Sequence, residues 1–364
     1  MIKRILFFTI LCTFIFMCSK NTNHVPDYSN AIAESKRLLD SLITDGKVPG
    51  IDAAVAINGE IVWSEAFGYA DLEHQIPVIA GKTRFRIGSV SKPFASAALG
   101  KLMDMNKIDL DKSIQTYVPY FPIKKYPITT RQVGGHLAGI RHYNGDEFLL
   151  NQRFDSVKEG LSIFIDDTLL FEPGSQFSYS SYGFNLLSAA IEGASGNEFL
   201  TFMQEEVFRP LEMSSTCADK NDSIITNRTS FYAIDTLNNY INAPSVNNSY
   251  KWAGGGFLST TTDLIKFGNA HMNPGLLSEK TLQELKTPQI LDDGDTTDYG
   301  IGWFCSFDSK SFGHDGGSVG GITRFWIYPE LDLILVLLSN SINTEYGSVA
   351  KQIREVFSEA KNVK

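Results

Sequence analysis

Segments with the pattern of β-strands lie at both ends of this 364-residue chain, and the long stretch between them is mostly helical in pattern. Near the start, two apolar segments flank Asn58-Gly59, a dipeptide that strongly favours a two-residue hairpin. The expected strands span 51–57, 61–68, 299–304, 311–314, 321–328 and 333–338, with a turn at 329–332. This distribution predicts one antiparallel sheet formed by both ends of the chain, because strands must share a sheet to bury their apolar faces.

Helical periodicity precedes, separates and follows these strands. The expected helices cover 31–44, 90–105, 129–137, 154–166, 183–193, 196–208, 261–271 and 343–360. Thr260 and Asp263 have the spacing of a capping box, in which two side chains bond each other's backbone N–H, at the start of the 261–271 helix.

Together the elements predict an α/β protein of the α+β type, with helices flanking the sheet. A single domain would cover 31–360, its sheet part formed by 31–88 and 296–360 and its helical part by 89–295. A cleft between the two parts is the expected place for a functional site.

Composition excludes several classes of function. The chain is 43% hydrophobic and 20% charged, which is ordinary for a soluble globular protein, and its net charge of −9 includes no basic stripe. We therefore expect no nucleic-acid partner. His136 and His142 form the closest histidine pair, and no cysteine or carboxylate lies between them. We expect neither a metal site nor another cofactor.

The first residues have the pattern of a targeting segment. Lys3 and Arg4 precede an apolar run that ends at residue 17 and is too short to span a bilayer. Cys18 and a polar tether over 18–30 follow, so the start resembles a bacterial lipoprotein signal over 1–17, although Met17 stands where a small residue is usual. The resemblance implies lipidation of Cys18, export across the inner membrane, and attachment to a membrane in the periplasm or at the cell surface. Plain secretion, an uncleaved anchor and organelle targeting are the alternatives.

Two further cysteines, Cys217 and Cys305, lie inside the predicted domain. An oxidising compartment would allow one disulfide between them. Two buried thiols are an equal alternative, because their spacing in the sequence does not decide.

Ser89 and Lys92 are the first candidates for chemistry, because residues three apart share one face of a helix. A neighbouring amine that takes the hydroxyl proton turns serine into a nucleophile. The same spacing also occurs twice in the charged C-terminal helix, at Ser348/Lys351 and Ser358/Lys361. There we interpret the pairing as an accident of a solvated face.

Three patterns in order set the first pair apart. They are Ser89-Val90-Ser91-Lys92, Tyr179-Ser180-Ser181 and His314-Asp315-Gly316-Gly317. With the stretches 139–143 and 248–260, this set resembles the serine beta-lactamase and penicillin-binding superfamily, in the branch of class C beta-lactamases, D-aminopeptidases and related esterases. The resemblance covers about 31–360 and implies a beta-lactamase/transpeptidase-like fold.

The resemblance also implies roles for individual residues. Ser89 corresponds to the nucleophile, Lys92 to the adjacent amine, and Tyr179 to a general base or proton shuttle. The backbone N–H groups of Ser89 and Gly317 would form the oxyanion hole. His314, Asp315 and Gly316 would line the strand beside the substrate. Lysine and tyrosine ordinarily have pKa values near 10, so neither is a base at pH 7, and the sequence leaves open which of Lys92 and Tyr179 becomes one.

Two departures from the superfamily pattern bear on the substrate. Ser181 replaces an asparagine, and His314-Asp315 replaces a Lys-Thr pair that normally helps to bind a substrate carboxylate. The anionic Asp315 would repel such a carboxylate, so we expect weak beta-lactamase and carboxypeptidase activity. The preferred hypothesis is a peptidase that acts on a peptide or another small acyl substrate through a Ser89 acyl-enzyme, as the His-x-Gly of D-aminopeptidases suggests. The alternatives are an esterase and a non-catalytic protein that binds peptides or acts as a scaffold, and no oligomeric state is predicted.

Overall fold

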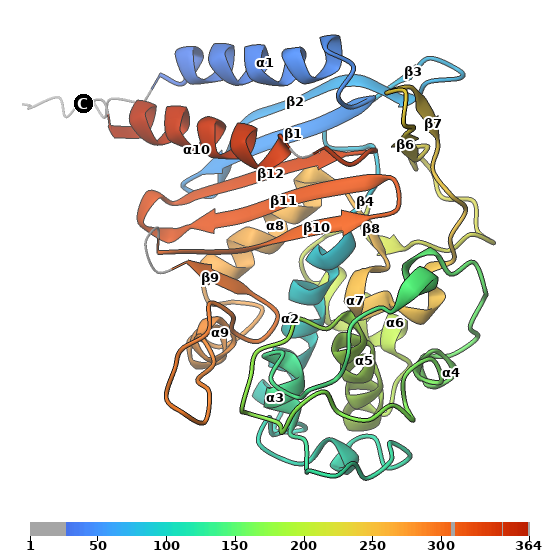
Figure 1. Ribbon diagram of the computed structural model, residues 1–364. Helices are drawn as coiled ribbons and strands as arrows, with labels where there is room; N and C mark the ends of the chain where they lie inside the picture. Colours follow the sequence, from blue (N-terminus) through green and yellow to red (C-terminus); the bar gives the residue numbers. More distant parts are fainter. Residues whose placement is uncertain (1–26, 307–309, 344, 363–364) are drawn as a thin grey trace, which may run out of the picture.

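The computed structural model describes residues 27–306, 310–343 and 345–362 (Figure 1). The predicted signal segment 1–17, Cys18 and most of the 18–30 tether lie outside the described residues. Within the described ranges, no helix combines the length and the apolar character that crossing a bilayer requires.

The two ends of the chain meet in the centre of one seven-stranded sheet. Its order is β3-β2-β1-β12-β11-β10-β9, and β1 (Gly50–Ile57) pairs antiparallel with β12 (Leu333–Ser339), so that Ala54 lies opposite Val336. The remaining strands are β2 (Glu60–Asp71), β3 (Ile76–Pro77), β9 (Phe304–Ser306), β10 (Ser311–Ser318) and β11 (Gly321–Tyr328). The predicted antiparallel sheet made by both ends of the chain is confirmed.

Helices cover both faces of this sheet. On one face lie α1 (Ser29–Thr44) and α10 (Tyr346–Asn362), side by side, and on the other lies α8 (Thr261–Met272) (Figure 1). Alternate residues of β1 point to opposite faces of the sheet. Val55 packs with α1 and α10, while Ala54 belongs to the larger core on the α8 side. Every residue of β1 is consequently buried.

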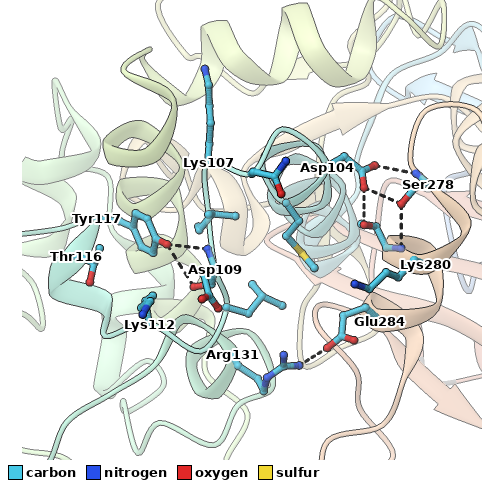
Figure 2. A pocket seen from close by; sticks show the side chains of 15 residues that line it. Asp104, Lys107, Asp109, Lys112, Thr116, Tyr117, Arg131, Ser278, Lys280 and Glu284 are labelled. Atoms are coloured by element: carbon cyan, nitrogen blue, oxygen red, sulfur yellow. Dashed lines mark hydrogen bonds and ion pairs between the residues drawn. The ribbon is translucent and has the colours of Figure 1, made fainter.

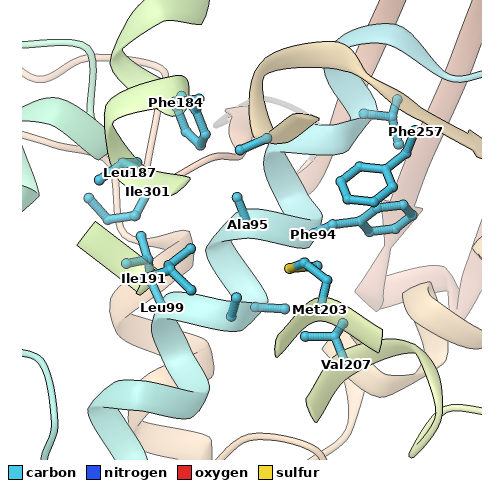
Figure 3. Close-up of a cluster of buried hydrophobic side chains, with 14 of the residues drawn as sticks. Phe94, Ala95, Leu99, Phe184, Leu187, Ile191, Met203, Val207, Phe257 and Ile301 are labelled. Carbon is cyan, nitrogen blue, oxygen red and sulfur yellow. The ribbon is translucent and has the colours of Figure 1, made fainter. Parts of the chain in front are cut away.

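The helical part surrounds α2 (Ser91–Asp104), 11 of whose 14 residues are buried. Phe94 and Leu99 of α2 pack among Phe184, Met203 and Phe257 (Figure 3). The neighbouring helices are α3 (Thr130–Gly134), α4 (Val157–Leu161), α5 (Ser181–Ser195), α6 (Phe199–Phe202), α7 (Trp252–Gly255) and α9 (Glu279–Lys286), and a π-helical turn covers Met203–Phe208. A short three-stranded sheet combines β4 (Phe85–Arg86), β8 (Phe257–Ser259) and β5 (Cys217–Ala218). A separate pair, β6 (Tyr232–Ile234) and β7 (Tyr240–Asn242), lies beside β3 (Figure 1). A helix packed on all sides holds its first turn in a fixed place.

Several local predictions were wrong in extent. The helix expected over 154–166 covers only Val157–Leu161, and the chain continues as turns in which Phe164 and Ile165 both donate to the Leu161 carbonyl. The strand expected over 299–304 is a turn as far as Trp303, with Gly302 at φ +82°. Helix α9 was not predicted.

Two smaller predictions are settled by side-chain contacts. Thr260 accepts the N–H of Asp263 and caps α8, but the Asp263 carboxylate bonds Ser215 and Thr216 instead of completing the box. Cys217 and Cys305 are free thiols.

Candidate active site

Ser89 sits where a short strand turns into the buried helix α2. β4 ends at Arg86, and a 3-10 turn over Gly88–Val90 leads into the helix. Arg86 anchors the start of this turn. Its Nε lies 2.7 Å from Asp219 Oδ2, and its Nη1 donates to the Val319 carbonyl at 2.8 Å. The junction therefore presents Ser89 at the start of α2, partly exposed.

Lys92 is wholly buried and contacts three oxygen atoms. Its Nζ lies 3.0 Å from Ser89 Oγ, 3.1 Å from Ser181 Oγ and 2.7 Å from the Gly254 carbonyl oxygen. An uncharged amine has two N–H donors and one lone pair. The Gly254 carbonyl can only accept, so a neutral Lys92 would donate to Gly254 and Ser181 and receive the Ser89 hydroxyl proton in its lone pair.

The surroundings of Lys92 favour the uncharged amine. Burial lowers the pKa of Lys92 well below its usual value, and the positive charge of Lys251 lowers it further. The three atoms that it contacts belong to hydroxyl and carbonyl groups, none of which carries a full negative charge. Lys92 is thus suited to accept a proton at neutral pH.

Tyr179 completes the group beside Ser89. It precedes α5, whose first turn is capped by Ser180, and its ring centroid lies 4.7 Å from Lys92 Nζ. Burial raises the pKa of Tyr179 well above its usual value, and hydrogen bonds with Ser89 and Ser181 only partly oppose this. The phenol therefore keeps its proton at neutral pH and can donate it.

Strand β10 brings Gly316 and Gly317 against the turn that carries Ser89. Gly88 has φ +51°, and a Cβ atom there would lie 2.9 Å from Gly317 N. A Cβ on Gly316 would lie 3.0 Å from the carbonyl carbon of Ile87. The glycines permit this close approach, which places the N–H groups of Ser89 and Gly317 on neighbouring segments, as an oxyanion hole requires.

His314 faces the site from β10 as a neutral, buried ring. Its Nδ1 lies 2.6 Å from the Asp315 carbonyl oxygen and its Nε2 lies 3.0 Å from Tyr299 Oη. Since a carbonyl only accepts, Nδ1 carries the proton and Tyr299 donates to Nε2. Burial is the main cause that lowers the pKa of His314 to about 3, and Lys92 adds to it when protonated, so this residue supplies no positive charge for a carboxylate.

The side chain of Asp315 points to the opposite face of the sheet. Neighbouring residues of a strand alternate between faces, and the Asp315 carboxylate accepts from Trp326 Nε1 at 2.8 Å and forms an ion pair with Arg324. The structure thus does not bring this carboxylate to Ser89. The structure therefore does not support the expected repulsion of a substrate carboxylate by Asp315.

His142 and Lys251 also belong to this region, although neither was predicted to have a role there. His142 Nδ1 accepts the backbone N–H of Ser181 at 3.1 Å, and its half-buried ring lies edge-on to Tyr179. Burial lowers the pKa of His142 to about 4, so the neutral ring carries its proton on Nε2. The sequence signal for His142 was its place in the stretch 139–143. Lys251 lies in the stretch 248–260, but nothing there marked this lysine as functional.

Other polar clusters lie away from Ser89. Among the described residues, one group has the geometry to hold a metal ion: Asp71, Glu73 and His74, on β2 and the turn after it. This group lies across the sheet from β10, and Asp71 and His74 already form an ion pair. It offers no metal to the Ser89 site.

A cavity of about 670 Å³ lies at the far end of α2, around its last residue, Asp104 (Figure 2). Fourteen residues at 1.5 Å each separate the two ends of this helix by ~20 Å. Within the cavity the Asp104 carboxylate accepts from Ser278, and Arg131 forms an ion pair with Glu284. Ser89 does not line this cavity.

Comparisons with known proteins agree with this geometry. A family model described as beta-lactamase matches residues 36–356. The human mitochondrial serine beta-lactamase-like protein LACTB is 32% identical over 401 residues, covering 83% of this chain and 73% of that protein. Penicillin-binding protein 4* of Bacillus subtilis (strain 168) is 27% identical over 314 residues, covering 80% of this chain and 68% of the relative.

Solved structures show the same fold at lower identity. The D-amino acid amidase from Ochrobactrum anthropi SV3, complexed with D-phenylalanine, superposes with a TM-score of 0.80 at 21% identity, over 91% of this chain and 100% of that one. The beta-lactamase/transpeptidase-like fold is thereby confirmed. Because the family model spans nearly all of the described domain, the chain belongs to the beta-lactamase family of serine hydrolases.

Proposed function

We propose that this protein hydrolyses amide bonds in small, uncharged peptide-like substrates through an acyl-enzyme on Ser89. One observation carries the proposal: a wholly buried Lys92 lies 3.0 Å from Ser89 Oγ, and its three contacts include no carboxylate. General-base activation of this kind contributes ~10²- to 10⁴-fold to a rate.

Acylation follows from the hydrogen bonds of the resting site. Lys92 accepts the Ser89 hydroxyl proton while Oγ attacks the carbonyl carbon of the substrate. Negative charge develops on the carbonyl oxygen, where the N–H groups of Ser89 and Gly317 stabilise it. Tyr179 then gives its proton to the departing nitrogen and recovers one from Lys92, so that a Ser89 ester and a free amine remain.

Deacylation uses the same groups in reverse. Lys92, neutral again, accepts a proton from water as the water oxygen attacks the ester carbonyl. The carbonyl–Oγ bond breaks, Ser89 regains its proton, and a carboxylic acid leaves. A protonated Tyr179 favours amides as substrates, because an amine departs only when its nitrogen is protonated, whereas a good alcohol leaving group needs no such help.

The walls of the site suggest a substrate without a full charge near β10. His314 is neutral, and the Asp315 carboxylate is directed to Arg324 on the other face. Phe177, 40% exposed, and Phe304, which stacks on Tyr179 at 6.3 Å, supply apolar surface. These features support an apolar acyl or amine group, and the structural likeness to a D-amino acid amidase is consistent with an amide.

The alternatives make different demands on the same site. An esterase would not depend on the Tyr179 proton, and a non-catalytic binding protein would not need an activated Ser89. The departures at Ser181 and Asp315 would fit that last alternative, yet Ser181 still contacts Lys92, and the Asp315 carboxylate binds Trp326 and Arg324 on the other face. Weak beta-lactamase activity remains expected, because a neutral His314 cannot pair with the carboxylate of a beta-lactam.

A fluorophosphonate probe tests the nucleophile directly. We expect one covalent adduct by intact mass, lost in Ser89→Ala and retained in Ser348→Ala, the matched change in a second Ser-x-x-Lys pair. Unlabelled protein is then assayed on amino-free peptide amides, matched esters and nitrocefin. Absence of an adduct on folded protein would favour the binding alternative, and nitrocefin turnover comparable with that of true beta-lactamases would contradict the substrate assignment.

We further propose that Cys18 anchors the protein to a membrane after export. The support is the apolar run before Cys18 and the polar tether after it. Cell fractionation of the full chain and of Cys18→Ala tests this. The anchor is supported if the substitution moves the protein from the membrane fraction to the soluble one, and contradicted if both variants fractionate alike.

A further inference from the structure

Lys251 is a buried lysine enclosed by aromatic rings. It is 2% exposed, and its Nζ lies 4.4 Å from the ring centroid of Phe148, 5.2 Å from that of Tyr250 and 5.6 Å from that of Tyr143. Ring faces attract a cation. Within the described part of the chain, no carboxylate comes within ion-pair distance of this Nζ, so the rings are its main support.

The same short segment carries Lys251 and a direct contact of Lys92. Lys251 precedes α7, and its carbonyl accepts the N–H of Gly255 at 2.8 Å. The carbonyl of Gly254, one residue earlier in this turn, accepts from Lys92 Nζ at 2.7 Å. Tyr143, part of the ring enclosure, also hydrogen-bonds Ser181, the second partner of Lys92. Lys251 is therefore connected to Lys92 by two short routes through the packed interior.

We propose that Lys251 is a positioning residue whose ammonium group, fixed by the turn that binds Lys92, keeps Lys92 uncharged and ready to accept the Ser89 proton. The inference rests on the Ser89–Lys92 pair of the proposed function. A cation beside a catalytic lysine disfavours a second positive charge in the same low-dielectric interior.

The other titratable groups around Lys92 do not supply this effect. His136, packed beside α3, His142 and His314 of β10 each have a pKa lowered mainly by burial, so they are neutral when Lys92 acts. Tyr179, which precedes α5, keeps its proton. Lys251 is the charge that acts on Lys92 from the α7 side.

The groups around Lys251 set the pH range in which it acts. Burial lowers the pKa of Lys251 to about 7; Arg86 lowers it too, and Asp219 acts in the opposite direction. Glu147, the nearby acid whose carbonyl accepts from Tyr250, is itself paired with Arg141. Lys251 is thus charged below neutral pH, which is where Lys92 would otherwise begin to take up a proton.

Lys251→Met tests the proposal without a known substrate. The rate of fluorophosphonate labelling of Ser89 is measured from about pH 5.5 to about pH 9. Loss of the Lys251 charge raises the pKa of Lys92, so the acid limb of the profile should move upward by about one pH unit. Labelling near pH 6 should then be ~10-fold slower, while labelling near pH 9 stays within ~2-fold of the wild-type rate.

Two further variants separate this effect from a structural one. Lys286→Met removes a different lysine, which is half-buried and has its Nζ 4.6 Å from the ring centroid of Phe312. This variant should leave the pH profile of labelling unchanged. Lys251→Arg retains the charge and should restore the acid limb. An unchanged profile for Lys251→Met, or an equal loss at every pH, overturns the proposal. Failure of the wild-type protein to label overturns instead the nucleophile on which it rests.

Discussion

Gly88→Ala is the substitution that most directly tests how the turn before α2 supports catalysis. Gly88 has φ +51°, and an L-residue in that region costs about 1–2 kcal/mol. The new Cβ would meet the Gly317 carbonyl oxygen most closely and would lie 2.7 Å from the carbonyl carbon, where ordinary contact begins at 3.4 Å. The Ser89 turn must therefore withdraw from β10 by roughly 0.7 Å or more.

The expected loss of activity is larger than the loss of stability suggests. A 1 Å displacement of a catalytic group costs on the order of 10²-fold, so Gly88→Ala should slow fluorophosphonate labelling by ~10- to 100-fold. Overpacking adds to the backbone cost, giving about 2–4 kcal/mol less stability in urea. Both are measured on protein shown to be folded at the assay temperature.

Gly59→Ala is the matched control. Gly59 has φ +82° in the β1–β2 turn, and nothing lies within 4 Å of its hypothetical Cβ. This variant should lose about 1–2 kcal/mol of stability and label at the wild-type rate. Wild-type labelling by Gly88→Ala, or an equal loss in Gly59→Ala, would refute the reasoning about the oxyanion hole.

Two other predictions concern side chains near the site. Tyr179→Phe should slow hydrolysis of an anilide by ~10²-fold or more but slow a matched p-nitrophenyl ester by less than ~10-fold, because only the amine needs the phenolic proton; kcat/KM for the pair measures this, and equal losses would contradict it. Asp315→Asn breaks a partly exposed ion pair with Arg324 and should cost less than ~1 kcal/mol without changing the preference between neutral and carboxylate-bearing substrates; a changed ratio of kcat/KM values would return Asp315 to the substrate site.

The spacing of Ser89 and Lys92 predicted their contact, but spacing alone would have predicted two more. In α10 the Ser348 hydroxyl bonds the Glu345 carbonyl, and the Ser358 hydroxyl bonds the Arg354 carbonyl. Both hydroxyls bond carbonyl groups of the preceding turn, as serine commonly does in a helix. What distinguishes Ser89 is its place at a junction between a strand and a buried helix, which was recognised only through the ordered set of motifs.

The order of the motifs also did not show which way the side chain of Asp315 points. The order of motifs located His314 and Asp315 on the strand beside the site, yet two neighbours on a strand cannot both face it. Alternation alone would have assigned the carboxylate to the far face once His314 was placed near Ser89. The role of Lys251 was not accessible in this way, because its ring enclosure combines residues from two separate stretches of the chain.

Buried lysines with lowered pKa values make the free energy of unfolding of this protein rise with pH. In the unfolded chain a lysine has a pKa of ~10.4, whereas burial lowers the pKa of Lys251 to about 7 and that of Lys92 well below its usual value. Between those limits the unfolded state binds more protons than the folded one, so the free energy of unfolding rises with pH, by about 1.4 kcal/mol per pH unit for each such lysine. This contribution is complete above pH ~10.4 and is lost as pH falls toward the folded pKa.

Urea unfolding between about pH 7.5 and pH 9.5 measures this slope. Tyr179 and the other buried tyrosines have raised pKa values and therefore act only above that window. Lys251→Met should reduce the slope by one lysine's share, about 1.4 kcal/mol per pH unit, and Lys286→Met should change it less, because Lys286 is only half-buried. A slope that is the same in the wild type and in Lys251→Met would mean that Lys251 is charged in the folded protein throughout this range. It would then act on Lys92 at every pH at which the enzyme works.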